Sequence, residues 1–354
     1  MERIMIYPYS KAYEPYVLYA GLLTDREISS LVTPNGSGLA GKQICVGEKK
    51  LVISNDYEAE LHRCDAVWFV NDETFALSED MVEKKLIEAV KQGKKIIFTR
   101  TSVADHNRIE NIIPPAQNMS LQELYLTEDK FGADYCYHID TPVLVVYGTE
   151  RDTDKLAVQL ALRDELIRIG YRTTSISSRT DGVLYGMHPI PEYMLKAAYS
   201  EGDKIRKYNH YVKQIELEEN PDILIIGIPG GVLPYDRVDH NDYGILAYEM
   251  SFAVPCDAAI VCMPYNSEFD GDFSSFANDM EQIFRYHTIG CHIAAAVPDM
   301  QTALDNRKRH LVRLDRSFVE TKVKQYNRQN VFHIVSNDGV SDCVQHILNE
   351  LSES

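Results

Sequence analysis

The fold of this chain is limited above all by one pattern, in which wholly apolar strands alternate repeatedly with segments of helical spacing. In the first half, apolar runs flank a segment over residues 81–90 that has helical spacing and a glycine just past its end. Strands that are apolar on both faces belong to parallel sheets covered by helices on both sides. The candidate strands here are residues 3–7, 31–33, 51–53, 66–70 and 96–99. This half therefore predicts a small Rossmann-like domain, residues 1–112.

The second half repeats the pattern over a longer stretch, with a strong helical segment at residues 156–169 that ends at a glycine. Its candidate strands are residues 142–148, 172–178, 221–227, 256–263, 289–297 and 331–335. Residues 113–140 interrupt the alternation with two prolines, a glycine and several tyrosines, which indicates a connector with room for one short helix. The fold class is therefore α/β with two parallel-sheet domains, the second spanning residues 141–354.

The loop that follows the strand at residues 142–148 has the order strand, loop, lysine, helix of a P-loop. In a working P-loop, a glycine before the lysine lets backbone N–H groups cradle phosphate, and a Ser or Thr after the lysine holds magnesium. Here those two positions carry Asp154 and Leu156 around the retained Lys155. A carboxylate at Asp154 is expected to repel phosphate. Lys155 has two interpretations, a retained phosphate ligand or an exposed residue at a helix start.

Other candidate residues follow the neighbouring strands, since ligands of open α/β sheets bind at the carboxyl edge. The candidates for holding a cofactor are Gly148, Thr149, Glu150, Lys155, Arg179, Asp181, Gly230 and Gly231. A polar segment further on supplies the pocket candidates Asp236, Arg237, Asp239 and His240. For this segment a solvated loop is the alternative, although binding residues concentrate on loops.

The composition indicates which classes of partner are disfavoured and in which cellular compartment the protein is expected. The net charge of -17 disfavours nucleic acid and anionic membranes, which need a basic face, and no apolar run is long enough to span a bilayer. Seven cysteines without a CxxC pair indicate a reducing compartment, and therefore the cytoplasm. No metal-ligand spacing is present, and Cys291 and His292 point to opposite faces of one strand, so they do not act together.

At this point the order of motifs from Val143 to Asn266 resembles a P-loop family that includes D-glutamate N-acetyltransferases and is distantly similar to dethiobiotin synthetases. The loop of that family reads GTD followed by a GK pair, and Gly148-Thr149-Glu150 and Lys155 fall at matching spacing. Its second strand ends in TGQTG, which residues 178–182 match loosely. The resemblance implies a degenerate P-loop domain with a nucleotide as the possible cofactor.

The third strand of that family runs D-x-x-x-x-EG-x-G. Asp222 and Gly230-Gly231 match this pattern, whereas Gly227 stands where the family has its glutamate. The departures thus fall on the loop glycine, the magnesium hydroxyl and this acidic residue.

The chain as a whole resembles a narrower group, the peptide maturation system proteins. In clostridial-type cassettes these accompany a radical SAM maturase and a Cys-rich precursor peptide, and the resemblance implies a role in making a modified ribosomal peptide. Two hypotheses follow. The chain is an accessory protein that binds the precursor peptide or the maturase, or it is a nucleotide- or acyl-donor-dependent ligase or N-acyltransferase acting on the peptide. Related P-loop proteins are often dimers, which makes a homodimer the expected assembly.

Overall fold

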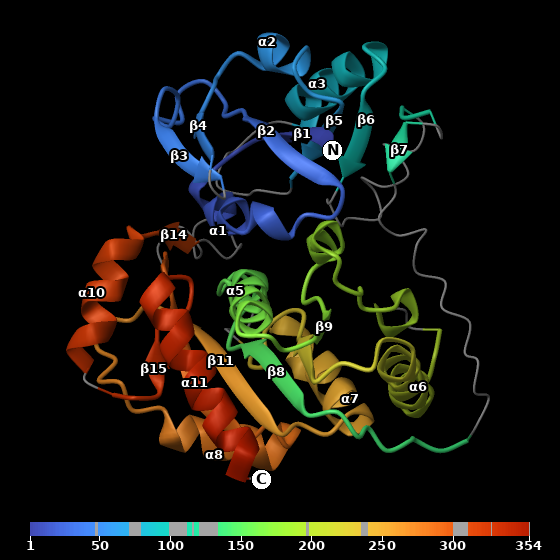
Figure 1. Ribbon diagram of the computed structural model, residues 1–354, viewed down its shortest axis with the longest axis vertical. Coiled ribbons are helices and arrows are strands. Elements are labelled where there is room, and N and C mark those ends of the chain that lie inside the picture. The colour runs from blue at the N-terminus through green and yellow to red at the C-terminus, as the bar shows by residue number, and fades with distance from the viewer. Residues whose placement is uncertain are drawn as a thin grey trace. The chain divides into compact units, whose positions relative to one another are not determined.

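The computed structural model describes residues 1–46, 49–70, 79–98, 112–114, 117–119, 134–195, 198–234, 240–299, 311–326 and 328–353. The chain forms two compact units (Figure 1). Unit 1 comprises Met1–Tyr125 and Val183–Gly186, and unit 2 comprises Leu126–Gly182 and Met187–Ser354.

Unit 1 is built on a 5-stranded sheet in the order β2-β1-β5-β6-β7, with every pairing parallel. Its strands are β1 Glu2–Tyr7, β2 Arg26–Leu31, β5 Ala66–Phe69, β6 Lys95–Phe98 and β7 Asn118–Met119. This order is that of flavodoxin-like doubly wound sheets, so the predicted Rossmann-like domain is confirmed. β7 lies in the predicted connector, most of which is outside the described residues. The strand predicted at residues 51–53 is instead part of an antiparallel hairpin, β3 Gln43–Val46 with β4 Lys49–Val52.

Helices cover the sheet of unit 1 as the wholly apolar strands predict. On one face, Met5 and Val67 pack against α2 Tyr57–Leu61 and α3 Glu79–Lys91. On the other face, the fully buried Trp68 meets the edge of the Tyr13 ring, which ends a short 3-10 turn before α1 Glu14–Leu18.

The four residues Val183–Gly186 belong to unit 1 although their neighbours in sequence belong to unit 2, which differs from the continuous domains expected from the sequence. Tyr185 is fully buried and its hydroxyl donates a hydrogen bond to the Tyr16 carbonyl at 3.0 Å. The Leu184 carbonyl accepts from the Thr24 N–H at 3.2 Å. Because these bonds use single residues rather than a repeating pattern, hydrophobic periodicity does not reveal them.

Unit 2 is built on a 6-stranded sheet, also parallel throughout, in the order β15-β12-β11-β8-β10-β9. Its strands are β8 Val143–Gly148, β9 Thr173–Ile176, β10 Ile223–Gly227, β11 Ala258–Pro264, β12 Thr288–Ala294 and β15 Val331–Phe332. Each lies within or close to a segment predicted to be a strand. The predicted fifth strand runs too far, because β13 Ala296–Pro298 turns away to pair with β14 Leu311–Arg313.

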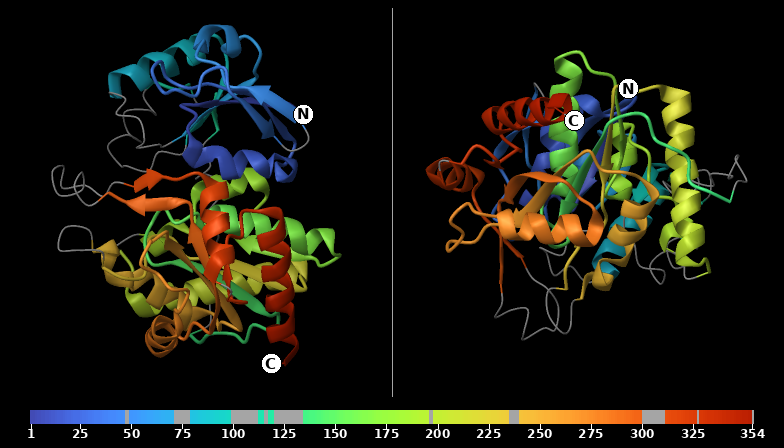
Figure 2. Two further views of the ribbon diagram at one scale, coloured as in Figure 1. Left: turned by 90° about the vertical axis from the view of Figure 1, so that its left-hand side faces the viewer. Right: turned by 90° about the horizontal axis from the view of Figure 1, so that it is seen from below.

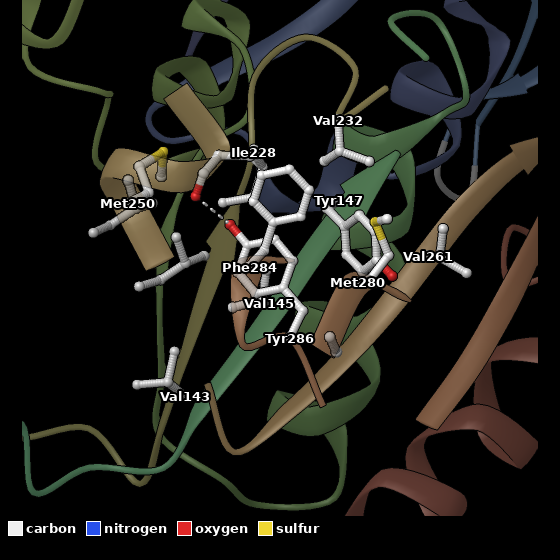
Figure 3. Packing of buried hydrophobic residues seen from close by; sticks show 14 of the residues in the cluster. Val143, Val145, Tyr147, Ile228, Val232, Met250, Val261, Met280, Phe284 and Tyr286 are labelled. Carbon is white, nitrogen blue, oxygen red and sulfur yellow. Dashed lines mark hydrogen bonds between the residues drawn. The ribbon is translucent and has the colours of Figure 1, made fainter. Parts of the chain in front are cut away.

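The two faces of this sheet carry different helices (Figures 1 and 2). α5 Lys155–Arg168 and α11 Asn337–Glu353 lie side by side on one face. The main core fills the other face, where Val143, Val145 and Tyr147 of β8 meet side chains of the helices opposite (Figure 3). Those helices are α6 Glu201–Glu219, α7 Ile245–Ala253 and α8 Ser274–Phe284, and α10 Arg316–Tyr326 precedes β15.

A 3-10 turn at Glu192–Leu195 comes before α6. Within the described ranges, no helix is both long enough and apolar enough to cross a bilayer.

Candidate functional site

The loop between β8 and α5 adopts the backbone conformation that a P-loop glycine normally supplies. Asp154 is the N-cap residue of α5 and lies in the left-handed region, with φ 63° and ψ 17°. That conformation costs a residue other than glycine roughly 1–2 kcal/mol. The Asp154 side chain makes no capping hydrogen bond, so it does not satisfy the N–H groups of the first helical turn. An uncapped helix start with free N–H groups favours an anion.

The Asp154 carboxylate is neutralised by a residue far along the chain. Its Oδ1 atom accepts a hydrogen bond from Arg313 Nη1 at 2.7 Å, and both side chains are largely buried. Burial acts to raise the pKa of Asp154, but Arg313 and other nearby cationic groups outweigh it, and the pKa lies below its usual value. The repulsion of phosphate expected from this carboxylate is therefore compensated by Arg313.

Lys155 is buried, so its interpretation as an exposed residue at a helix start is wrong. Its ammonium donates to the carbonyl oxygens of Glu150 at 2.7 Å and Arg151 at 2.8 Å. No carboxylate among the described residues forms an ion pair with it. Burial lowers the pKa of Lys155 to about 8. The loop thus holds a buried cation that donates to peptide carbonyls and has no ion-pair partner in the described structure, although the charges of Asp152 and Asp154 also act on it.

The position that carries the magnesium hydroxyl in a working P-loop is part of the apolar interior. Leu156 is 1% exposed on the α5 face of the sheet. The nearest hydroxyl in sequence, that of Thr153, lies 3.2 Å from the Glu150 and Arg151 carbonyls, to which it donates. The loop geometry therefore offers an anion its N–H groups and its lysine, without the hydroxyl ligand for magnesium.

Gly230 and Gly231 lie directly against this loop. A Cβ atom at Gly231 would come within 2.7 Å of the Glu150 Cα and of the Thr149 carbonyl oxygen, so only glycine allows the approach. The Val232 N–H donates to the Gly148 carbonyl at 3.0 Å. Gly230 has φ +75°, which turns the chain after β10. The predicted residues 148–150 and 230–231 are thus brought together at the carboxyl ends of β8 and β10.

Arg179 and Asp181 lie at the end of β9 and connect to the same loop. Arg179 Nη2 lies 2.9 Å from Asp181 Oδ2, and its Nη1 lies 3.9 Å from Asp152 Oδ1. Asp181 is only 1% exposed, and its Oδ1 atom has no hydrogen-bond partner among the described residues. Two predicted residues therefore form an ion pair beside the loop, in which the Asp181 carboxylate is buried and the Arg179 guanidinium is partly exposed.

The glutamate position of the resembling family is closed by another side chain. A Cβ atom at Gly227 would lie 2.1 Å from Gln159 Oε1, so a larger residue fits there only if the Gln159 side chain moves. Gln159 comes from α5, donates to the Ile176 carbonyl at 2.8 Å and accepts from the Ser178 N–H at 2.9 Å. It thereby ties the end of β9 to the start of α5, where the family has an acidic group.

Of the remaining pocket candidates, the structure describes only His240. Asp236, Arg237 and Asp239 lie outside the described residues. His240 stacks on Tyr243 with ring centroids 4.5 Å apart. Within the described ranges no three His, Cys, Asp or Glu side chains gather in a group that could hold a metal ion.

Sequence reasoning misses three side chains that shape this edge: Gln159, Arg313 and Asn241. The Asn241 amide donates to the Leu233 carbonyl at 2.8 Å and lies where a Cβ on Gly231 would meet it. Of the three, only Gln159 carries a sequence signal, since it lies one helical turn beyond Lys155.

Comparison with protein-family models gives no match, and comparison with curated proteins gives none either. Among solved structures, a DUF1611 family protein from Anabaena variabilis matches over 99% of this chain and 100% of its own, with TM-score 0.62 and 12% identity. A cobyrinic acid a,c-diamide synthase from Mycobacterium smegmatis matches 43% of this chain and 74% of its own, with TM-score 0.27 and 16% identity. A GTPase from Pyrococcus abyssi matches 43% of this chain and 66% of its own, with TM-score 0.25 and 13% identity. At 12% identity, the similarity to the DUF1611 family protein is one of fold alone.

Proposed function

We propose that unit 2 binds a phosphate-bearing ligand, a nucleotide or an acyl donor, at the loop between β8 and α5 and does not hydrolyse it. The observation that carries this proposal is the Lys155 ammonium, which is buried at an uncapped helix start and has no ion-pair partner among the described residues. A buried cation is stabilised by an opposite charge, and here a ligand phosphate would supply that charge.

The absence of hydrolysis follows from Leu156 and Gly227. A working P-loop holds magnesium on a hydroxyl at the first of these positions, and here the side chain is packed in the interior. At the second position, Gln159 fills the space that an acidic residue would need. With neither group present, the site supports binding better than transfer of the phosphate.

Calorimetric titration with ATP, with and without magnesium, tests the ligand site. Lys155→Met keeps the aliphatic stem and removes the charge, and Lys49→Met, on the exposed hairpin of unit 1, is the matched control. The loss of hydrogen bonds from a charged donor is expected to weaken binding by about tenfold or more. Equal affinity in the wild type and in Lys155→Met, or no binding of ATP, would refute the proposed site.

The cellular role that the sequence predicts stays a proposal. In this role the chain is an accessory protein in the maturation of a ribosomally synthesised peptide, binding the precursor peptide or the radical SAM maturase. The buried Leu156 favours this accessory role over catalysis. Co-purification of the precursor or the maturase at micromolar concentration tests it, and the absence of any complex would count against it.

A ligase or N-acyltransferase that acts on the peptide is the second candidate, and the retained Lys155 favours it. Product formation in a reconstituted pathway that is abolished by Lys155→Ala would select this enzyme over the accessory protein. We also propose a cytoplasmic location, because all the cysteines are free thiols, and a homodimer, which light scattering would test.

A further inference from the structure

A buried polar cluster lies close to the Asp154–Arg313 ion pair, on the side of the sheet covered by α5 and α11. It consists of His292 on β12, His333 just after β15, and Arg316, the first residue of α10. The two imidazole rings are at most 2% exposed and stack with centroids 5.5 Å apart. No part of this cluster takes part in the phosphate site proposed above.

The hydrogen bonds of His292 show where its proton lies. Its Nδ1 atom accepts a hydrogen bond from the Ile334 N–H at 3.0 Å, so a neutral ring carries its proton on Nε2. Burial, and after it the neighbouring His333, lower the pKa of His292 to about 3, which keeps the ring neutral. The buried Nε2–H group has no hydrogen-bond partner among the described residues. It is a free donor.

His333 has the opposite arrangement. The carbonyl of Ile293 lies 2.9 Å from its Nδ1 atom, and because a carbonyl only accepts, Nδ1 carries the proton. Burial lowers the pKa of His333 below its ordinary value, so this ring is neutral as well. Its Nε2 atom is then a free acceptor, and it too is buried without a partner in the described structure. The Arg316 Nη2 group is a third such atom, a charged donor.

Each of these three buried atoms lacks a partner in the described structure, which is costly because it loses its hydrogen bond to water, and the charge of Arg316 acts on both rings. A metal ion does not satisfy them, because the Nε2 atom of His292 bears a proton and lacks a free lone pair. The group that does satisfy them accepts from two donors, gives a hydrogen to one acceptor, and carries negative charge opposite a guanidinium.

We propose that this cluster binds a protonated oxyanion, of the class of hydrogen phosphate or bicarbonate. Its charged oxygens accept from His292 and Arg316, and its O–H group donates to His333. The inference does not depend on the phosphate-bearing ligand at Lys155, because the two sites use different side chains.

The experiment is a calorimetric titration of the full chain, carrying Lys155→Met so that the loop does not contribute. Inorganic phosphate and sulfate are the probes at neutral pH, and bicarbonate is titrated in parallel to distinguish the two sources of a protonated oxyanion. Sulfate has the size of phosphate but no proton to give to His333. We expect phosphate or bicarbonate to bind at least about tenfold more tightly than sulfate. Equal binding of sulfate, or no binding of any probe, would mean that water fills the cluster and would overturn the proposal.

Two matched pairs of variants separate ligand binding from structure. His292→Asn keeps an acceptor for the Ile334 N–H, and His333→Asn keeps a donor for the Ile293 carbonyl, while both remove Nε2. Each is expected to fold normally and to lose about tenfold in affinity for the bound anion. His292→Gln and His333→Gln replace the Nε2 position and should retain more of the binding. Unchanged affinity in both Asn variants would contradict the assignment.

A measurement on the unmodified chain guards against variants that do not fold. The imidazole ¹⁵N resonances of His292 and His333 are expected to shift on addition of the bound anion and to remain in place on addition of sulfate. Resonances that do not shift on addition of any of these anions would likewise overturn the proposal.

Discussion

Replacing Asp154 with glycine is the most informative perturbation, because it restores the residue of a working P-loop and removes a buried charge in one step. The first effect is favourable. Asp154 has φ 63°, and relief of the left-handed conformation stabilises the chain by roughly 1–2 kcal/mol.

The second effect is unfavourable and larger. Arg313 then loses the carboxylate 2.7 Å away, in a site where its side chain is only 19% exposed. Breaking a buried ion pair by removing one partner typically costs about 3–5 kcal/mol. The net expectation is a loss of about 1–4 kcal/mol in the free energy of unfolding, even though glycine is the residue that the backbone prefers.

Urea unfolding followed by circular dichroism measures this change, and hydrogen exchange of the α5 amides assigns it to unit 2. The single tryptophan, Trp68, lies in unit 1, so its fluorescence is an internal control for a specific effect. The double variant Asp154→Gly with Arg313→Met is expected to recover most of the loss, since it also removes the guanidinium that has lost the Asp154 carboxylate. A single variant Asp154→Gly that is as stable as the wild type, or more stable, would refute the reasoning.

Three further predictions concern other contacts. Gly231→Ala places a Cβ atom 2.7 Å from backbone atoms and should cost about 1–3 kcal/mol by urea unfolding, whereas Gly202→Ala, with nothing within 4 Å, should be neutral or stabilising. Burial raises the pKa of Glu216, but hydrogen bonds from Lys213 and from backbone N–H groups outweigh this effect and hold the pKa below its ordinary value of 4.5. Its stabilisation is therefore complete above pH 4.5 and is lost as the pH falls through the lowered value, and Glu216→Gln should flatten that part of the acid-stability curve. Tyr185→Phe leaves the Tyr16 carbonyl without its donor and should destabilise unit 1 by about 1 kcal/mol, read from Trp68 fluorescence.

Much of the fold can be predicted from the sequence. A wholly apolar strand indicates that both of its faces are buried, and an amphipathic helix indicates that one face is buried. The strands of unit 2 fall within or close to their predicted ranges for this reason. The prediction is wrong where pairing depends on contacts distant in sequence. β4 pairs with β3 in a hairpin, and β13 leaves the sheet to meet β14. A short apolar run reveals that a strand exists, but it does not reveal its partner.

The candidate site is predicted less completely, and the reason is the sequence distance between its parts. Gly148, Lys155 and Gly231 can be recognised because each follows or precedes a strand or helix end at the sheet's carboxyl edge. Arg313 cannot, because it lies 159 positions from the carboxylate that it neutralises. Without Arg313, the sequence predicts repulsion of phosphate at Asp154. The sign of that electrostatic effect depends on one residue that no local pattern connects to the loop.

The three positions that differ from a working P-loop, Asp154, Leu156 and Gly227, have different surroundings in the structure. At Asp154 an arginine balances the new charge, and at Gly227 a glutamine fills the new space and hydrogen-bonds two strand ends. Asp154 is buried, and a buried carboxylate needs an opposite charge whether or not the site binds a ligand. Leu156 has no such polar replacement and belongs to the core. The edge thus combines a buried lysine and an uncapped helix start with an apolar residue in place of the magnesium hydroxyl, and this combination supports the proposed binding of a phosphate-bearing ligand without hydrolysis.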